Sequence, residues 1–187
     1  MTIVPQACQS CGLCAAGCPN RAIQVDDRDL ETALARLIAP DAAMVPVDPF
    51  VPRIVAFCCR RSAVQAREMA ISMGHRLPSG MVFVEGVCGG TFAVRHLLSA
   101  LEAGADGVMV LTCHEGNCHS ESGALNARKR VLTTTQALAQ ADIAADRIQF
   151  GTLAANMGAE FAHRVDLFAK TIMAMGPAMK NSKGHRA

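Results

Sequence analysis

The 187-residue sequence contains no tryptophan and no tyrosine, and seven phenylalanines are its remaining large aromatic residues. Proteins that stack nucleic-acid bases need an aromatic platform, so this scarcity argues against single-stranded nucleic-acid binding. The formal net charge is only +2, so bulk electrostatics point to neither a nucleic acid nor an anionic membrane surface. We therefore expect no nucleic-acid partner.

Long apolar segments and an export signal are also missing. The longest apolar runs are the length of β-strands and are interrupted by Glu85, Asp106 or glycines, so none could span a bilayer. The first residues have neither a charged n-region nor an apolar h-region. We expect a cytoplasmic protein without a membrane span. Two short basic runs, Arg60–Arg61 and Arg128–Arg130, are interpreted as solvated helix faces.

Nine cysteines are the informative residues of this chain. Their odd number and the lack of an export signal argue against a secreted disulfide scaffold, and clustered cysteines in a reducing compartment are more often metal or cluster ligands. Four lie in one short stretch and five are widely spaced: Cys8, Cys11, Cys14 and Cys18, then Cys58, Cys59, Cys88, Cys113 and Cys118.

The first four cysteines have the spacing of a bacterial ferredoxin run, with Pro19 after the fourth, and predict a [4Fe-4S] cluster. Gly12 permits the tight turn between them. A zinc knuckle is the alternative. The run occurs only once, so two arrangements remain open. Either Cys18 closes one cluster with Cys8, Cys11 and Cys14, or the segment is half of a ferredoxin that another subunit completes.

The chain divides into two unequal parts. Residues 1–45 form the predicted ferredoxin-like segment, with a helix over 29–38, and a Pro- and Ala-containing linker covers 39–52. Residues 52–177 form the larger domain, and 178–187 form a flexible tail.

Within the larger domain, short apolar runs alternate with helical periodicity. Strands are predicted at 53–57, 81–84, 108–111 and 147–150, because these runs are apolar and rich in β-branched residues. Helical stripes follow each strand: Ala66, Met69, Ala70 and Met73; Val94, Leu97, Leu98 and Leu101; residues 120–141; and Phe161, Val165, Phe168 and Ile172, with Asn156 as a helix cap. This order predicts an α/β fold, a small three-layer domain of the flavodoxin or Rossmann kind whose parallel sheet carries helices on both faces.

The five spaced cysteines follow strands. Cys58 and Cys59 end the first predicted strand, Cys88 follows the second, and Cys113 and Cys118 follow the third. Because ligands bind at the carboxyl ends of parallel strands, we expect these thiols to meet there. Four thiolates can hold zinc or an iron–sulfur cluster, while buried structural cysteines are the alternative.

Neighbouring residues refine this prediction. Adjacent strand residues point to opposite faces, so only one of Cys58 and Cys59 should ligate, and we favour Cys59. Nearby glycines would let backbone amides approach sulfur: Gly86, Gly89, Gly90 and Gly116. His114 and His119 are alternative ligands, but we expect them to support the site or start the next helix.

The quoted residues match a known family. Arg53-Ile-Val-Ala-Phe-Cys-Cys59, Val87-Cys88 and the stretch from Gly104 to His119 resemble the delta subunit of methyl-viologen-reducing hydrogenases over about residues 52–177. Residues 1–45 resemble the last ferredoxin half of heterodisulfide reductase flavoproteins. Family members usually carry a third cysteine shortly after the Cys pair, where this chain has Arg60, Arg61 and Ser62. Ser62 is a poor ligand, which shifts weight to Cys58 or Cys59.

The resemblance implies a [2Fe-2S] cluster in the α/β domain and an electron relay. Its partners would be a flavoprotein subunit of the heterodisulfide reductase type and a catalytic subunit of the dehydrogenase or hydrogenase kind. No nucleotide-binding fingerprint and no catalytic nucleophile stand out, so we expect no substrate site and no catalytic residue. A zinc-stabilised interaction protein and a redox sensor are the alternative functions.

Overall fold

The computed structural model describes residues 4, 6, 8–20, 22–23 and 50–178. The predicted helix over residues 29–38, the linker up to residue 49 and the tail from residue 179 lie outside these ranges. The N-terminal part that is described contains one short helix, α1 (Leu13–Gly17). The remainder is the α/β domain.

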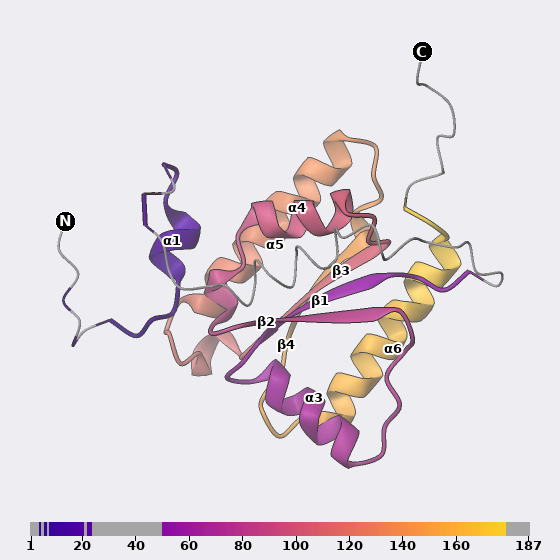
Figure 1. Cartoon of the computed structure of the whole chain (residues 1–187), viewed down its shortest axis with the longest axis horizontal. Helices are drawn as coiled ribbons and strands as arrows, with labels where there is room; N and C mark the ends of the chain where they lie inside the picture. Colours follow the sequence, from indigo (N-terminus) through magenta and orange to yellow (C-terminus); the bar gives the residue numbers. More distant parts are fainter. Residues whose placement is uncertain (1–3, 5, 7, 21, 24–49, 179–187) are drawn as a thin grey trace.

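Four parallel strands form the sheet in the order β2-β1-β3-β4 (Figure 1). They are β1 (Ile54–Cys59), β2 (Met81–Gly86), β3 (Gly107–Thr112) and β4 (Ile148–Thr152). All four predicted strands are present, and each continues slightly further toward its carboxyl end than its apolar run. The two central strands, β1 and β3, are buried at every residue, whereas the edge strands β2 and β4 are partly exposed.

Helices cover both faces of the sheet in two pairs (Figure 1). The first pair is α3 (Ala63–Ser72) with α6 (Gly158–Met175), and the second is α4 (Val94–Glu102) with α5 (Gly123–Gln140). Each pair encloses its own apolar cluster against the sheet, one around Phe161 and Ile54 and the other around Phe57 and Leu97. The α/β fold with a helical layer on either side of a parallel sheet is therefore confirmed.

Two details of the helices differ from the sequence prediction. In α3, Ala66 and Ala70 are buried, but Met69 and Met73 of the predicted apolar stripe are 37% and 57% exposed. The helix rests on its small alanine face, which leaves the longer methionines outside. Asn156 is not a cap, because α6 begins after Met157 and no side chain caps it.

The strand order creates a topological switch point. From β1 the chain passes to β2 on one side and then returns to β3 on the other side of β1. The connecting helices α3 and α4 consequently cover opposite faces, and the carboxyl ends of β1 and β3 border the place where ligands bind in open parallel sheets. Cys59 is the last residue of β1, and Cys113 directly follows β3.

Candidate functional site

Four of the five spaced cysteines come together at the switch point. The Cys113 thiol lies within hydrogen-bond distance of both the Cys59 and the Cys118 side chains. Cys88 is close enough to Cys59 and to Cys118 for electrostatic interaction between the thiols. Cys88 and Cys118 also share a neighbour, because a Cβ added at Gly123 would overlap Cys88 Sγ and lie 3.3 Å from Cys118 Sγ.

Cys58 lies on the other side of the sheet. Its side chain belongs to the apolar cluster between the sheet and helices α3 and α6, as expected for successive residues of a strand. Burial raises the pKa of the Cys58 thiol to about 12. This thiol therefore remains neutral and packs as a small apolar side chain.

The thiols at the switch point influence one another. The hydrogen bond with Cys113 lowers the pKa of Cys59 below its usual value, and the backbone N–H groups of Arg61 and Gly89 add to this effect. The same hydrogen bond raises the pKa of Cys113, and burial adds to that rise. Burial raises the pKa of Cys88, and hydrogen bonds from Ser120 and from the Gly90 N–H, at 3.4 Å from Cys88 Sγ, oppose that rise.

Glycines make room for these sulfurs. Gly123 is the first residue of α5 and is buried against Cys88 and Cys118. The positive end of the α5 dipole thus points toward the sulfurs, which favours negative charge there. Gly89 and Gly90 are buried in the short helix η2 (Gly89–Thr91) that follows Cys88. Gly116 has no neighbour that an added side chain would meet.

The N-terminal cysteine segment packs on the loop that carries Cys88. Gly12 is buried with a φ of 72°, and a Cβ there would lie 2.7 Å from Thr91 Cγ2. Leu13 fills the space beside Gly90. Thr91 Oγ1 lies 2.6 Å from the Cys88 carbonyl oxygen and 3.4 Å from the Cys11 carbonyl oxygen. One hydroxyl group therefore connects the backbones of the two cysteine groups.

Arg130 supports the same contact from α5. Its guanidinium donates hydrogen bonds to the Gly90 carbonyl and, at 3.2 Å, to the Phe92 carbonyl. Its Nη2 would lie 4.0 Å from a Cβ at Gly17 of α1. The interpretation of residues 128–130 as a solvated face is wrong for Arg130, because its side chain turns inward between η2 and α1.

The two histidines of the Cys113–Cys118 region, His114 and His119, are both exposed. Within the N-terminal segment, Cys8 and Cys14 are exposed and Cys11 and Cys18 are partly buried. Across residues 8–20 and 50–178, no three Cys, His, Asp or Glu side chains converge as a single metal ion would require.

Three polar or small residues of this site were not singled out from the sequence, namely Thr91, Ser120 and Gly123, and Arg130 was noted only as part of a basic run. Threonine, serine and arginine carry no spacing signal, and their roles follow from tertiary contacts. Gly123 was detectable in principle, since it opens a helix that follows a cysteine closely.

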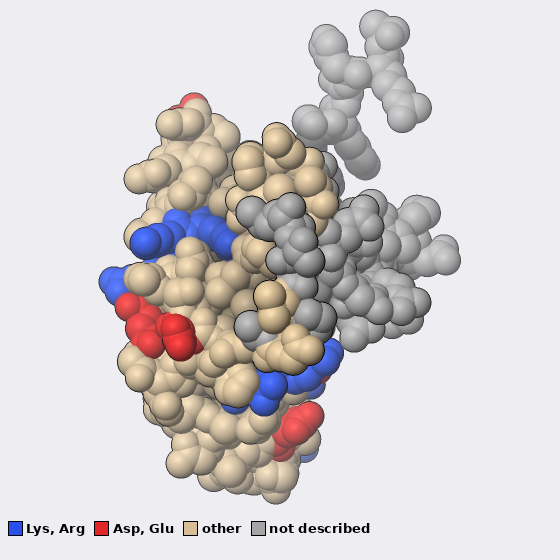
Figure 2. Space-filling model, turned by 90° about the vertical axis from the view of Figure 1, so that its left-hand side faces the viewer, with Lys and Arg blue, Asp and Glu red and all other residues tan. Residues whose placement is uncertain are grey.

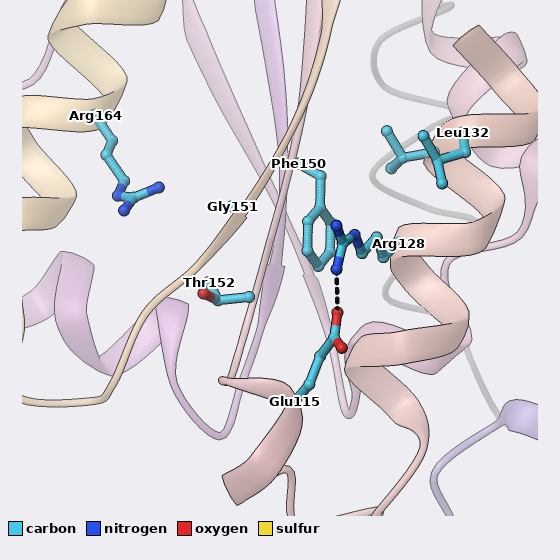
Figure 3. Close-up of a pocket in the computed structure, with 8 residues that line it drawn as sticks. Glu115, Arg128, Leu132, Phe150, Gly151, Thr152 and Arg164 are labelled. Carbon is cyan, nitrogen blue, oxygen red and sulfur yellow. Dashed lines mark hydrogen bonds and ion pairs between the residues drawn. The ribbon is translucent and has the colours of Figure 1, made fainter. Parts of the chain in front are cut away.

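A depression of about 550 Å³ adjoins the Cys113–Cys118 loop (Figure 3). Phe150 and Thr152 of β4 line it, and Arg164 of α6 reaches its opposite side. At one edge Arg128 forms an ion pair with Glu115, with 3.2 Å between Arg128 Nη1 and Glu115 Oε1. This ion pair links the loop to α5.

The face in Figure 2 carries small separate groups of basic and acidic residues on a mostly uncharged surface. This distribution agrees with the low net charge. No helix in the part of the chain that the structure describes is long and apolar enough to cross a membrane.

Comparison with known proteins gives two family matches. Residues 54–176 match the methyl-viologen-reducing hydrogenase delta subunit, and residues 1–24 match a 4Fe-4S binding domain. An iron–sulfur subunit of the F420-non-reducing hydrogenase of Archaeoglobus profundus is 32% identical over 126 residues, which are 67% of this chain and 92% of that protein. The vhu iron–sulfur subunit of the F420-non-reducing hydrogenase of Methanocaldococcus jannaschii is also 32% identical, over 67% of this chain and 94% of that protein.

A third relative includes more of this chain. It is a subunit of the ferredoxin:CoB-CoM heterodisulfide reductase of Methanosarcina mazei, 27% identical over 156 residues, which are 83% of this chain but only 19% of that protein. The resemblance inferred from the cysteine pattern is thus confirmed for both parts of the sequence. The chain belongs to the methyl-viologen-reducing hydrogenase delta subunit family and carries a 4Fe-4S binding domain at its N-terminus.

Proposed function

We propose that this protein is an iron–sulfur electron-transfer subunit of a multi-subunit cytoplasmic oxidoreductase. The family match and the relatives named as iron–sulfur subunits support an electron-transfer role. The proposed relay uses one cluster in the N-terminal segment and one in the α/β domain. When bound, each cluster would accept and release electrons, while the protein sets the spacing, shielding and potential.

In the α/β domain we propose a [2Fe-2S] cluster held by the four thiols at the switch point: Cys59, Cys88, Cys113 and Cys118. The donor set fits, because such a cluster takes four cysteines and divides them between two irons. Zinc also takes four cysteine sulfurs, so the metal content of the reconstituted protein distinguishes the two centres. Backbone N–H groups from Arg61, Gly89 and Gly90 supply hydrogen bonds to sulfur.

In the N-terminal segment we propose a [4Fe-4S] cluster on Cys8, Cys11, Cys14 and Cys18. The match of residues 1–24 to a 4Fe-4S binding domain supports this assignment. Cys18 either completes this cluster or serves one shared with another subunit. Gly12 and Leu13, between the second and third cysteines, provide the contact with the α/β domain.

The observation that carries the relay is the packing of Cys11 and Gly12 on the Cys88 loop. Thr91 Oγ1 lies within hydrogen-bond distance of the Cys11 carbonyl and of the Cys88 carbonyl, and these two cysteines are proposed ligands of different clusters. Electrons could thus pass from one cysteine backbone to the other through a single side chain. Arg130 holds the Cys88 loop in this position through the Gly90 and Phe92 carbonyls.

For partners we propose a catalytic dehydrogenase or hydrogenase subunit on one side and a flavoprotein of the heterodisulfide reductase type on the other. Relatives that bear both kinds of name support this assignment. Isolation of the native complex through a tag on this subunit tests it, and we expect both partners in stoichiometric amounts. Recovery of the tagged chain alone from gently lysed cells would contradict the proposal.

Substitution of the adjacent cysteines tests the ligand assignment directly. After anaerobic reconstitution we expect Cys59→Ala to lose the iron and the visible absorption of the α/β cluster, because Cys59 lies beside Cys113 and near Cys88. Cys58→Ala should retain both, because Cys58 packs in the opposite core. Iron and sulfide counts with EPR of the reduced protein provide the measurement. Equal iron in the two variants, or zinc in place of iron in the wild type, would contradict the assignment.

Two glycines provide a matched test of the space around the sulfurs. Gly123→Ala places a methyl group against Cys88 Sγ, so we expect most iron to be lost from the α/β cluster. Alanine favours helix more than glycine by about 1 kcal/mol, so the far-UV circular dichroism should be unchanged. Gly116→Ala in the nearby loop meets no neighbour and should bind iron normally. Full iron content in Gly123→Ala would show that Cys88 is not held where we place it.

A further inference from the structure

Ser62 is the one buried residue of the described ranges whose side-chain oxygen has no hydrogen-bond partner. It is only 2% exposed. Buried polar groups nearly always have a hydrogen-bond partner. An isolated buried hydroxyl therefore either destabilises the fold or has a partner that this structure lacks. The surroundings of Ser62 identify the partner.

The backbone around Ser62 is well bonded. The Ser62 N–H donates to the Cys59 carbonyl at 3.2 Å, which closes the turn after β1. The Ser62 carbonyl accepts from the Ala66 N–H at 2.9 Å, which begins α3. The isolated hydroxyl is therefore not a sign of a distorted loop.

A serine directly before a helix usually caps it, by accepting a hydrogen bond from an N–H of the first turn. Ser62 occupies this position before α3, yet its side chain makes no capping hydrogen bond, and its backbone (φ −146°, ψ −70°) is outside the β region that a helix-capping residue usually adopts. Capping therefore does not explain the serine. Its hydroxyl is free to donate in another direction, because a hydroxyl hydrogen rotates to suit its surroundings.

One polar group near Ser62 is the Cys59 sulfur. The Ser62 hydroxyl lies beside the Cys59 side chain, but it makes no hydrogen bond to the sulfur in the cluster-free protein. Cys59 precedes Ser62 by one tight turn, so the two side chains share the same buried space at the end of β1. Both side chains are buried, so the Ser62 hydroxyl is placed next to a proposed cluster ligand.

We propose that Ser62 Oγ donates a hydrogen bond to the Cys59 sulfur when the [2Fe-2S] cluster is bound, and that this bond favours the reduced cluster. The inference rests on the proposed function, since it requires the cluster. Reduction adds negative charge that spreads onto the ligand sulfurs, so a donor there raises the reduction potential. Ser62 is accordingly a positioning residue that acts through Cys59 and is not an iron ligand.

The test compares wild-type protein with Ser62→Ala and, as a matched control on the same helix, Ser72→Ala. Ser72 is exposed and bonds only to the Met69 carbonyl. We expect Ser62→Ala to keep the wild-type iron content and to have a more negative midpoint potential in an EPR-monitored redox titration. If the substitution lowers the equilibrium ratio of reduced to oxidised cluster roughly tenfold, the midpoint potential falls by about 59 mV for one electron. Ser72→Ala should leave the potential unchanged.

A spectroscopic readout separates this role from a structural one. In resonance Raman spectra, exchange from H₂O to D₂O should shift an Fe–S stretching band of the wild type, and part of that shift should disappear in Ser62→Ala. The cluster-free Ser62→Ala protein should unfold at the same temperature as the wild type or higher, because the hydroxyl neither caps nor bonds there.

The possible failures are distinct. An unchanged potential with an unchanged deuterium shift would overturn the role of Ser62 and leave the proposed function standing. Loss of iron in Ser62→Ala would also overturn it, because Ser62 would then be a ligand. A wild-type protein that binds no cluster in the α/β domain would defeat the proposed function itself.

Discussion

The parallel pairing of β1 with β2 and β3 is the constraint on which the candidate site depends. It fixes the carboxyl ends of three strands at one edge, so residues far apart in sequence become neighbours. It also decides which face of the sheet each cysteine occupies. Cys58 pairs with Leu111 of β3, and Cys59 is the last residue of β1. Because side chains alternate along a strand, a slip of one residue would exchange these two cysteines and dismantle the group.

The second requirement is close packing around the sulfurs without bulky side chains. Gly123 allows α5 to begin against Cys88 and Cys118, and Gly90 leaves room for Leu13 of the N-terminal segment. Both cysteine groups consequently use the same loop, which follows β2. Arg130 holds that loop from α5. A change in the loop would therefore affect the geometry of both proposed clusters. The fold of the α/β domain thus helps to set the distance over which electrons would pass between the two clusters.

Much of this architecture could be predicted from the sequence. The strands were recognisable because central strands buried on both faces read as continuous β-branched runs, and the cysteines at their ends followed from that assignment. The N-terminal run was recognisable by spacing alone. Alternation along the strand predicted that only one of Cys58 and Cys59 would ligate, and the preference for Cys59 rested on its position nearer the loop. The structure places the two side chains on opposite faces of the sheet.

Other features could not be predicted, because they depend on tertiary contacts. Arg128 and Arg130 belong to one basic run, but they are two residues apart and therefore lie on different sides of α5. Arg128 forms an ion pair with Glu115, and Arg130 donates a hydrogen bond to the Gly90 carbonyl. Thr91 and Ser62 resemble ordinary turn and cap residues until their partners are known. Met69 and Met73 followed a helical stripe, yet Ala66 and Ala70 of the same helix make the contact with the core.

The central claim is that two clusters lie close together, joined through the Cys88 loop. EPR of the fully reduced, iron-loaded protein tests this claim most directly, with Cys14→Ala as the reference that lacks the N-terminal cluster. The packing of Cys11 and Gly12 on Thr91 predicts magnetic interaction between the two reduced centres, visible as broadened signals and faster relaxation than in the reference. Two signals that simply add, with the relaxation of isolated centres, would contradict the account.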